Sequence, residues 1–139
     1  MMVYSHVALN CKDPIAVEKF YTKHFGFTRA RLIPLGDSDL VFIKSGNVYL
    51  ELFKTDQDGP KPEKDGSPVQ GVVRHIAFQV DDVDAKVKQM GSDAHITLGP
   101  LDFGAFIPGW RTVWLSDPAG NIVEVSQGYT DQDNPPPLT

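Results

Sequence analysis

Two histidines and two glutamates lie in the middle of short apolar segments of this chain: His6, Glu51, His75 and Glu124. Each segment has the length and composition of a β-strand, in which successive side chains point to opposite faces. The apolar neighbours of each His or Glu therefore share one face, and the polar side chain points to the other. A protein core does not hold unpaired carboxylates cheaply, so the polar face must be solvated, ion-paired or metal-bound. Two imidazoles and two carboxylates together suit a borderline divalent cation.

The chain repeats itself with an offset of 69 positions. His75 follows His6 at this offset, and identical residues recur at Asp13 and Asp82 and at Lys19 and Lys88. The glutamates follow more loosely, because Gly46-Asn47 precedes Glu51 as Gly120-Asn121 precedes Glu124, with one residue of slippage. A single polar residue on the open face of a sheet is ordinary. A repeat that places His and Glu in equivalent strands favours one shared site over chance surface polarity.

Gross composition predicts a single soluble domain of 139 residues, with 41% hydrophobic and 22% charged residues. The net charge of −5 and the absence of a basic run argue against a nucleic-acid partner. No apolar run approaches the roughly 18 residues of a membrane span, so no membrane partner is expected. The N-terminus has no signal-peptide pattern and the only cysteine is Cys11, so we expect a cytoplasmic protein without disulfides.

The order of predicted elements is the same in the two halves. Each half reads as a strand, a helix and three further strands. The first helix begins at Asp13-Pro14 and ends at Gly26, with strands expected over 27–35, 40–44 and 48–53. The second half has an expected strand over 72–80, a helix over 82–90, a short strand over 95–98, a Gly/Pro-rich loop over 99–109, and strands over 110–116 and 121–127. We therefore divide the single domain into module one (3–54), a solvated linker (55–71), module two (72–128) and a flexible tail (129–139).

These segments resemble the vicinal-oxygen-chelate superfamily, which includes glyoxalases, bleomycin-resistance proteins and dioxygenases. The resemblance covers about residues 3–128 and rests on His6, Leu50-Glu51-Leu52, Arg74-His75-Ile76-Ala77-Phe78, and Asp117-Pro118-Ala119-Gly120-Asn121 leading to Glu124. It implies an α+β fold of two tandem βαβββ modules, whose mixed sheets curl around a metal on their concave face.

Within that superfamily the order His, Glu, His, Glu is similar to glyoxalase I, whereas epimerases have glutamine in place of Glu51. The resemblance implies a lyase or isomerase that acts on a small oxygenated substrate through an enediolate. One divalent ion (nickel, zinc, cobalt or manganese) would bind His6, Glu51, His75 and Glu124, with either Glu124 or Glu51 as the base. Asn10 and Thr55 replace an arginine and an asparagine that glutathione-dependent glyoxalases use, so we expect an enzyme that is not strictly glutathione-dependent.

Further expectations concern the substrate pocket and the assembly. Four aromatic residues and one arginine are predicted to bind the substrate: Phe53, Phe103, Trp110, Arg111 and Trp114. A homodimer is expected, with the modules either swapped or unswapped between chains. His24 and His95 lack counterparts in the repeat and are expected at the surface. The alternatives are a metal-dependent epimerase, an antibiotic-modifying transferase, and a non-catalytic drug-binding protein.

Overall fold

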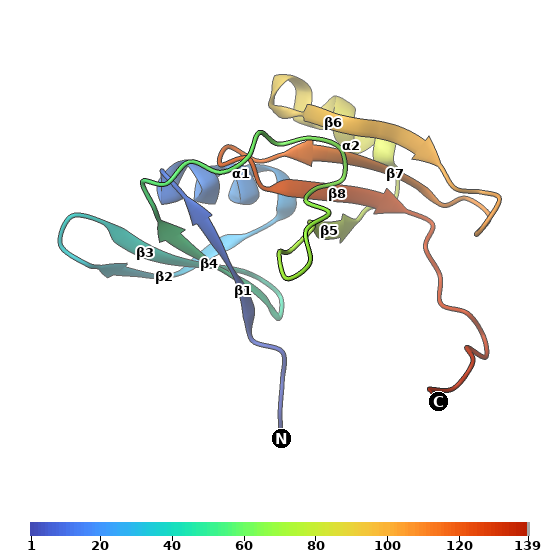
Figure 1. The fold of residues 1–139 in the computed structure, drawn as a ribbon, viewed down its shortest axis with the longest axis horizontal. Helices are drawn as coiled ribbons and strands as arrows, with labels where there is room; N and C mark the ends of the chain where they lie inside the picture. The colour runs from blue at the N-terminus through green and yellow to red at the C-terminus, as the bar shows by residue number, and fades with distance from the viewer. Residues whose placement is uncertain (139) are drawn as a thin grey trace.

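Module one is a four-stranded mixed sheet with one helix in a computed structural model that describes residues 1–138. Its strands pair in the order β1-β4-β3-β2, and β1 runs parallel to β4 (Figure 1). The elements are β1 (His6–Cys11), α1 (Pro14–Phe25), β2 (Thr28–Pro34), β3 (Asp39–Ser45) and β4 (Val48–Lys54). The predicted hairpin turn lies where expected, because β3 and β4 are separated only by Gly46 and Asn47.

Module two repeats this plan with strand order β5-β8-β7-β6 and β5 parallel to β8. Its elements are β5 (Ile76–Gln79), α2 (Val83–Met90), the short 3-10 helix η1 (Gly91–Asp93), β6 (His95–Asp102), β7 (Arg111–Ser116) and β8 (Ile122–Gln127). Two mixed sheets, each of βαβββ order, confirm the predicted fold class.

Two of the strand boundaries predicted above differ from the structure by more than one residue. The predicted strand over 72–80 shortens to Ile76–Gln79, because the residues before it turn toward the linker and His75 contacts Asp65. The short strand predicted over 95–98 extends to Asp102, into the predicted loop. Its pairing with β7 has register shifts near Leu98, so β6 is a bulged edge strand. Gly99 and Pro100, which are typical of loops, lie within it and led to the prediction of a loop.

Both helices begin and end at the residues that the sequence marks. The Asp13 carboxylate accepts hydrogen bonds from the backbone amides of Ile15 and Ala16, and Gly26 ends α1 in the left-handed conformation with φ of 71°. Asp82 caps α2 in the same way through the amide of Ala85. The helices therefore occupy equivalent places in the two modules.

One hydrophobic core runs through both modules. It includes Leu9, Leu52, Val113 and Val125, all at most 7% exposed. From α1 the fully buried Tyr21 donates a hydrogen bond of 2.8 Å to Oδ2 of Asp117, which follows β7. The modules are thus joined by a shared core and by a buried polar contact.

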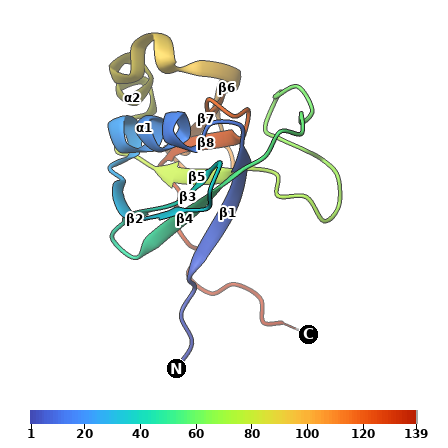
Figure 2. The ribbon, with the colours of Figure 1, turned by 90° about the vertical axis from the view of Figure 1, so that its left-hand side faces the viewer.

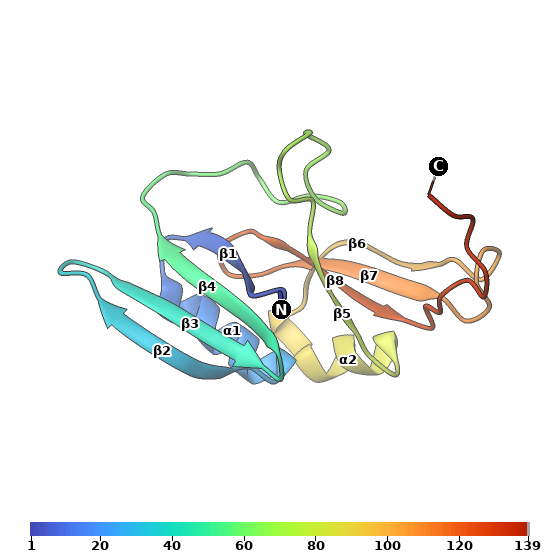
Figure 3. The same ribbon diagram turned by 90° about the horizontal axis from the view of Figure 1, so that it is seen from below.

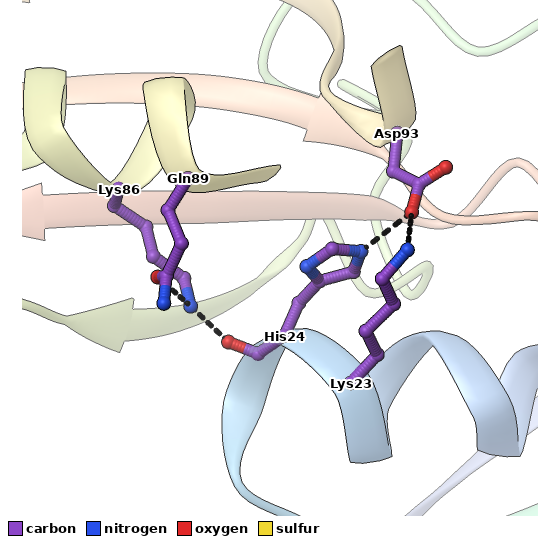
Figure 4. Close-up of polar contacts among 5 residues, drawn as sticks. All are labelled: Lys23, His24, Lys86, Gln89 and Asp93. Atoms are coloured by element: carbon purple, nitrogen blue, oxygen red, sulfur yellow. Dashed lines mark hydrogen bonds and ion pairs between the residues drawn. The ribbon is translucent and has the colours of Figure 1, made fainter. Parts of the chain in front are cut away.

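A polar cluster also crosses between the modules, at the end of α1 (Figure 4). His24 is only 6% exposed, and its Nε2 lies 2.8 Å from Oδ2 of Asp93 in η1, which also accepts a hydrogen bond of 3.0 Å from Lys23. The backbone carbonyl of His24 accepts a hydrogen bond from Lys86 of α2. The expectation of a surface position is therefore wrong for His24, because Asp93 gives the buried imidazole a polar partner at the boundary between the modules. His95 is exposed as expected.

The linker and the helices lie on opposite sides of the molecule. Figure 2 shows α1 and α2 on one side, and the linker between β4 and β5 looping out on the other. Figure 3 shows the linker passing across the top of the sheets, which lie side by side. Within residues 1–138, no helix is long and apolar enough to cross a membrane.

Candidate metal centre

The first pair of predicted ligands meets on the face of module one that points away from the core. In β1 and β4 the buried residues Leu9, Leu50 and Leu52 face the core, so by alternation His6 and Glu51 face the other way. Nε2 of His6 lies 3.2 Å from Oε1 of Glu51, and their side chains are 34% and 14% exposed. His6 also packs edge-on against the Phe42 ring of β3. We call His6 and Glu51 the first half-site.

The second pair meets in the same way on module two. Nε2 of His75 lies 3.7 Å from Oε1 of Glu124, and their side chains are 22% and 19% exposed. Trp114 is the partner of Glu124 across β7 and β8, so the two side chains share a face. The Trp114 ring lies edge-on to the His75 ring at 6.4 Å between centroids. We call His75 and Glu124 the second half-site.

Each histidine has its other ring nitrogen held by a hydrogen bond. Nδ1 of His6 lies 2.7 Å from the Ser5 hydroxyl, and Nδ1 of His75 lies 2.7 Å from the backbone carbonyl of Asp65. A carbonyl oxygen can only accept, so Nδ1 of His75 must carry the proton. In the neutral ring, Nε2 then presents its lone pair, and it does so toward Glu124. Metal-binding histidines in proteins usually show this arrangement.

The spacing within the half-sites is close to that of two ligands of one ion. Zinc-like ions hold nitrogen at about 2.0–2.1 Å and oxygen at about 2.0–2.2 Å, so neighbouring ligands are about 3.0 Å apart at octahedral angles and about 3.4 Å at tetrahedral angles. The first half-site, at 3.2 Å, lies within that interval. The second, at 3.7 Å, is a few tenths of an ångström wider and too long for a hydrogen bond. The nitrogen and oxygen donors of both half-sites therefore fit a divalent ion, the first at its present spacing and the second after it closes by a few tenths of an ångström.

The chain does not bring the two half-sites together by itself. Among residues 1–138, no group of three or more His, Cys, Asp or Glu side chains is close enough to hold one metal ion. Each module contributes one nitrogen and one oxygen donor. The structure therefore gathers the four predicted ligands as two separate pairs.

Three of the predicted substrate-binding residues gather beside the second half-site. The Phe103 ring lies 5.2 Å from Trp110 and 6.3 Å from Trp114 between centroids, and Trp110 donates a hydrogen bond to Ser126. Phe53 lies on the face of β4 that carries Glu51 and is 39% exposed. Arg111 and Trp114 point to opposite faces of β7. The Arg111 side chain donates a hydrogen bond of 3.0 Å to Asp84 of α2, on the helix side of the sheet.

A cavity of about 550 Å³ lies between the linker and the sheets. His75 lines it, together with Asn10, Arg74, Asn121 and the linker residues 59–63 and 66–69. Sequence reasoning treated the linker as solvated and therefore missed its contact with His75. His75 contacts the main-chain carbonyl of Asp65, which every residue type has, so the sequence carries no signal for this contact.

The Glyoxalase/Bleomycin resistance protein/Dioxygenase superfamily matches this chain over residues 4–125. Because that match spans most of the chain, including all four predicted ligands, the protein belongs to this superfamily. A comparison with curated proteins finds no match.

Solved structures from several bacteria share the fold. Lactoylglutathione lyase from Agrobacterium tumefaciens is 28% identical, with a TM-score of 0.60, and the match covers 91% of this chain and 93% of that one. The fosfomycin resistance protein FosX from Listeria monocytogenes has a TM-score of 0.70 at 17% identity, with 93% and 94% of the two chains covered. A glyoxalase/dioxygenase from Nostoc punctiforme has a TM-score of 0.68 at 22% identity, with 91% and 90% covered. The superfamily thus includes metal-dependent enzymes, and FosX has been crystallised with Mn(II).

Proposed function

We propose that this protein is a metal-dependent lyase or isomerase of the glyoxalase type, acting on a small oxygenated substrate. The observation that carries the proposal is the pairing of one histidine nitrogen with one glutamate oxygen in each module, at 3.2 and 3.7 Å. The proposed ligands of one divalent ion are His6, Glu51, His75 and Glu124. The 28% identity to a lactoylglutathione lyase supports the same class of reaction.

The charges of the four side chains suit proton transfer next to a carbonyl group. Two carboxylates balance a dication, so the loaded site is neutral. When bound, the ion acts as a Lewis acid that stabilises negative charge on substrate oxygens. Glu51 and Glu124 are each partly exposed on the open face of a sheet. Either carboxylate can remove a proton from the carbon beside a carbonyl and return it to the neighbouring carbon, an isomerisation with no net change in oxidation state.

We propose further that the working site is shared between two copies of the chain. The two half-sites do not meet among the described residues, and a four-ligand site needs both. In a swapped homodimer, His6 and Glu51 of one copy would face His75 and Glu124 of the other. An unswapped arrangement would instead require a rearrangement of the two modules within one chain.

Metal binding tests the first part of the proposal. Loss of a residue that only hydrogen-bonds to a metal ligand lowers metal affinity roughly 10–100-fold. We expect Glu51→Gln and His75→Ala, which remove proposed ligands themselves, each to weaken nickel or zinc affinity by more than this. His95→Ala is the matched control, because His95 is an exposed histidine on β6. Competition against a chromophoric chelator measures the affinities. Wild-type protein that takes up no stoichiometric metal would overturn the proposal.

Complementation tests the shared site. We expect a mixture of His6→Ala and His75→Ala proteins, unfolded and refolded together, to regain metal binding and activity, because a swapped heterodimer contains one site with all four ligands. Each variant refolded alone is the control. Sedimentation should give a dimer at micromolar concentration. A monomer, or a dimer whose mixed variants recover nothing, would refute the swapped arrangement.

We expect the glutathione hemithioacetal of methylglyoxal to be a poor substrate. Asn10 lines the cavity where glutathione-dependent relatives place an arginine, and the Thr55 hydroxyl is engaged by the backbone amide of Gln57. Loss of a charged hydrogen bond costs about 1.5–3 kcal/mol, or about tenfold to a hundredfold in affinity. Steady-state kinetics on this substrate, compared with hemithioacetals of other thiols, measures the preference. Efficient turnover with glutathione would contradict it.

The other reactions found in the superfamily are separated by a small substrate panel. Acyl-CoA epimers test epimerase activity, and fosfomycin, with and without a thiol, tests antibiotic modification. Binding of a drug-like compound without turnover of any of these, by protein that also binds no metal, would favour a non-catalytic binder.

A further inference from the structure

The linker contacts the second half-site from outside the sheet. It leaves β4, crosses the face of module two opposite the helices, and returns to β5 (Figures 1 and 2). The Thr97 hydroxyl of β6 donates a hydrogen bond of 2.6 Å to the backbone carbonyl of Lys64. The next carbonyl, that of Asp65, accepts from Nδ1 of His75 at 2.7 Å. Thr97 belongs to the edge strand β6 and His75 directly precedes the other edge strand, β5, so the main chain of Lys64 and Asp65 contacts both sides of this sheet.

Side-chain charge holds the same segment in place. Arg74, which precedes His75, donates a hydrogen bond of 2.8 Å to the Asp65 carboxylate. The ion pair therefore fixes the residue whose carbonyl holds the imidazole.

The backbone of the segment is fitted closely to the strand. Gly66 has a φ of +109°, and a Cβ at this position would lie 1.7 Å from the carbonyl oxygen of Arg74. Only glycine allows this approach. Gly71, in the same linker, also has a positive φ (+85°) but meets nothing within 4 Å. Among the glycines of the linker, only Gly66 beside His75 therefore makes such a close contact.

From these contacts we propose that residues 63–67 form a clamp that fixes the tautomer and orientation of His75. The clamp holds the proton on Nδ1, so that Nε2 keeps its lone pair directed to the place beside Glu124. Asp65, Gly66 and Arg74 are positioning residues, because they act through His75. The metal-binding part of this inference rests on the proposed function; the tautomer part does not.

Two glycine substitutions give a matched test. Gly66→Ala must displace the clamp, whereas Gly71→Ala changes the same kind of backbone position without a clash. We expect Gly66→Ala to lower nickel affinity about 10–100-fold, as loss of a partner of a metal-bound histidine does, and Gly71→Ala to leave it within about threefold. Competition with a chromophoric chelator gives the affinities, and circular dichroism checks that each variant is folded. Equal affinities for the two variants would overturn the proposal.

The tautomer is read directly in metal-free protein. Long-range 1H–15N spectra of the imidazoles distinguish a proton on Nδ1 from one on Nε2, and with four histidines in the chain a His75→Gln variant assigns the signal. We expect a single Nδ1–H form for wild type and Gly71→Ala, and a mixture for Gly66→Ala. A wild-type His75 that already shows both tautomers would overturn the clamp even if the protein binds metal. A fixed tautomer in protein that binds no metal would uphold the clamp and refute the metal site.

If Gly66→Ala does not fold, a second pair of variants decides. Asp65→Asn removes the charge that pairs with Arg74, and Asp58→Asn removes the charge of another linker aspartate, which pairs with Lys12 at an exposed site. We expect only Asp65→Asn to loosen the tautomer and weaken nickel binding. Equal behaviour of the two variants would refute the positioning role.

Discussion

Replacing Tyr21 by phenylalanine tests the buried contact that joins the modules. The Tyr21 hydroxyl is completely buried and donates to Asp117, which is 4% exposed. The Asp117 carboxylate also accepts from the backbone amides of Ala119 and Asn121 and from the Asn121 side chain. Phenylalanine keeps the ring and its packing but leaves the carboxylate with one donor fewer.

The expected cost depends on the charge of Asp117. A hydrogen bond to a charged group is worth about 1.5–3 kcal/mol and one between neutral groups about 0.5–1.5 kcal/mol. Burial raises the pKa of Asp117, and the hydrogen bonds, that of Tyr21 first, oppose this rise. A raised folded pKa favours the folded state at low pH, and this contribution is lost as the pH rises through the folded value. The hydrogen bond from Tyr21 stabilises the charged carboxylate and so offsets part of this loss of stability. Tyr21→Phe should therefore lower the free energy of unfolding by about 1.5–3 kcal/mol at pH 7, where Asp117 is charged, and by about 0.5–1.5 kcal/mol in acid, where it is neutral.

Urea unfolding at fixed protein concentration measures both values. Wild type and Tyr21→Phe are compared at pH 7 and at the lowest pH at which both remain folded, with Tyr4→Phe as the control, because Tyr4 is 80% exposed. A cost at pH 7 of less than about 0.5 kcal/mol, below the range for any intact hydrogen bond, would refute the reasoning. So would a cost that grows as the pH falls.

Two further predictions concern titratable groups. Burial, followed by the nearby charges of Asp117 and Asp13, raises the pKa of Cys11 from 9.0 to about 11, so at pH 8 its thiolate fraction should be about a hundredfold below that of a free thiol. Alkylation by iodoacetamide should be correspondingly slow until denaturant is added, and reaction of folded protein at the free-thiol rate would contradict this. Hydrogen bonds from His24 and then Lys23 lower the pKa of Asp93, so its stabilising contribution is present above the unfolded pKa and is lost as the pH falls through the folded value. Asp93→Asn should therefore flatten the fall of the melting temperature in acid, whereas Asp133→Asn in the tail should leave it as in wild type; parallel acid profiles for Asp93→Asn and wild type would argue against the contact.

The fold was predictable because its signals are local and occur twice. Asp13 and Asp82 cap the two helices, Gly26 ends the first, and Gly46-Asn47 forms a two-residue hairpin turn. Alternation within single strands was enough to place His6, Glu51 and Glu124 on the face away from the core, because one register fixes every side chain of a strand. His75 lies one residue before β5, and its position also depends on the linker.

Features that depend on contacts between distant segments were not predictable from these signals. The Arg111 side chain pairs with Asp84 of α2, a contact set by how the helix packs on the sheet. The burial of His24 had a partial signal, since it lies seven positions after Val17 on the apolar face of α1, but its partner Asp93 comes from the other module. The metal-ligand role of all four residues stays a prediction, because it requires two half-sites that the described chain keeps apart.

The contact between His24 and Asp93 has a consequence for how a duplicated chain differs from a pair of identical modules. In a two-fold symmetric pair, each contact between modules occurs twice, because residue i of one copy meets residue j of the other and the reverse. A chain that carries both modules is free of this requirement. Here the imidazole belongs to α1 of module one, and the carboxylate belongs to η1, which follows α2 of module two. The boundary between the modules can therefore hold complementary side chains that need not be present in both halves.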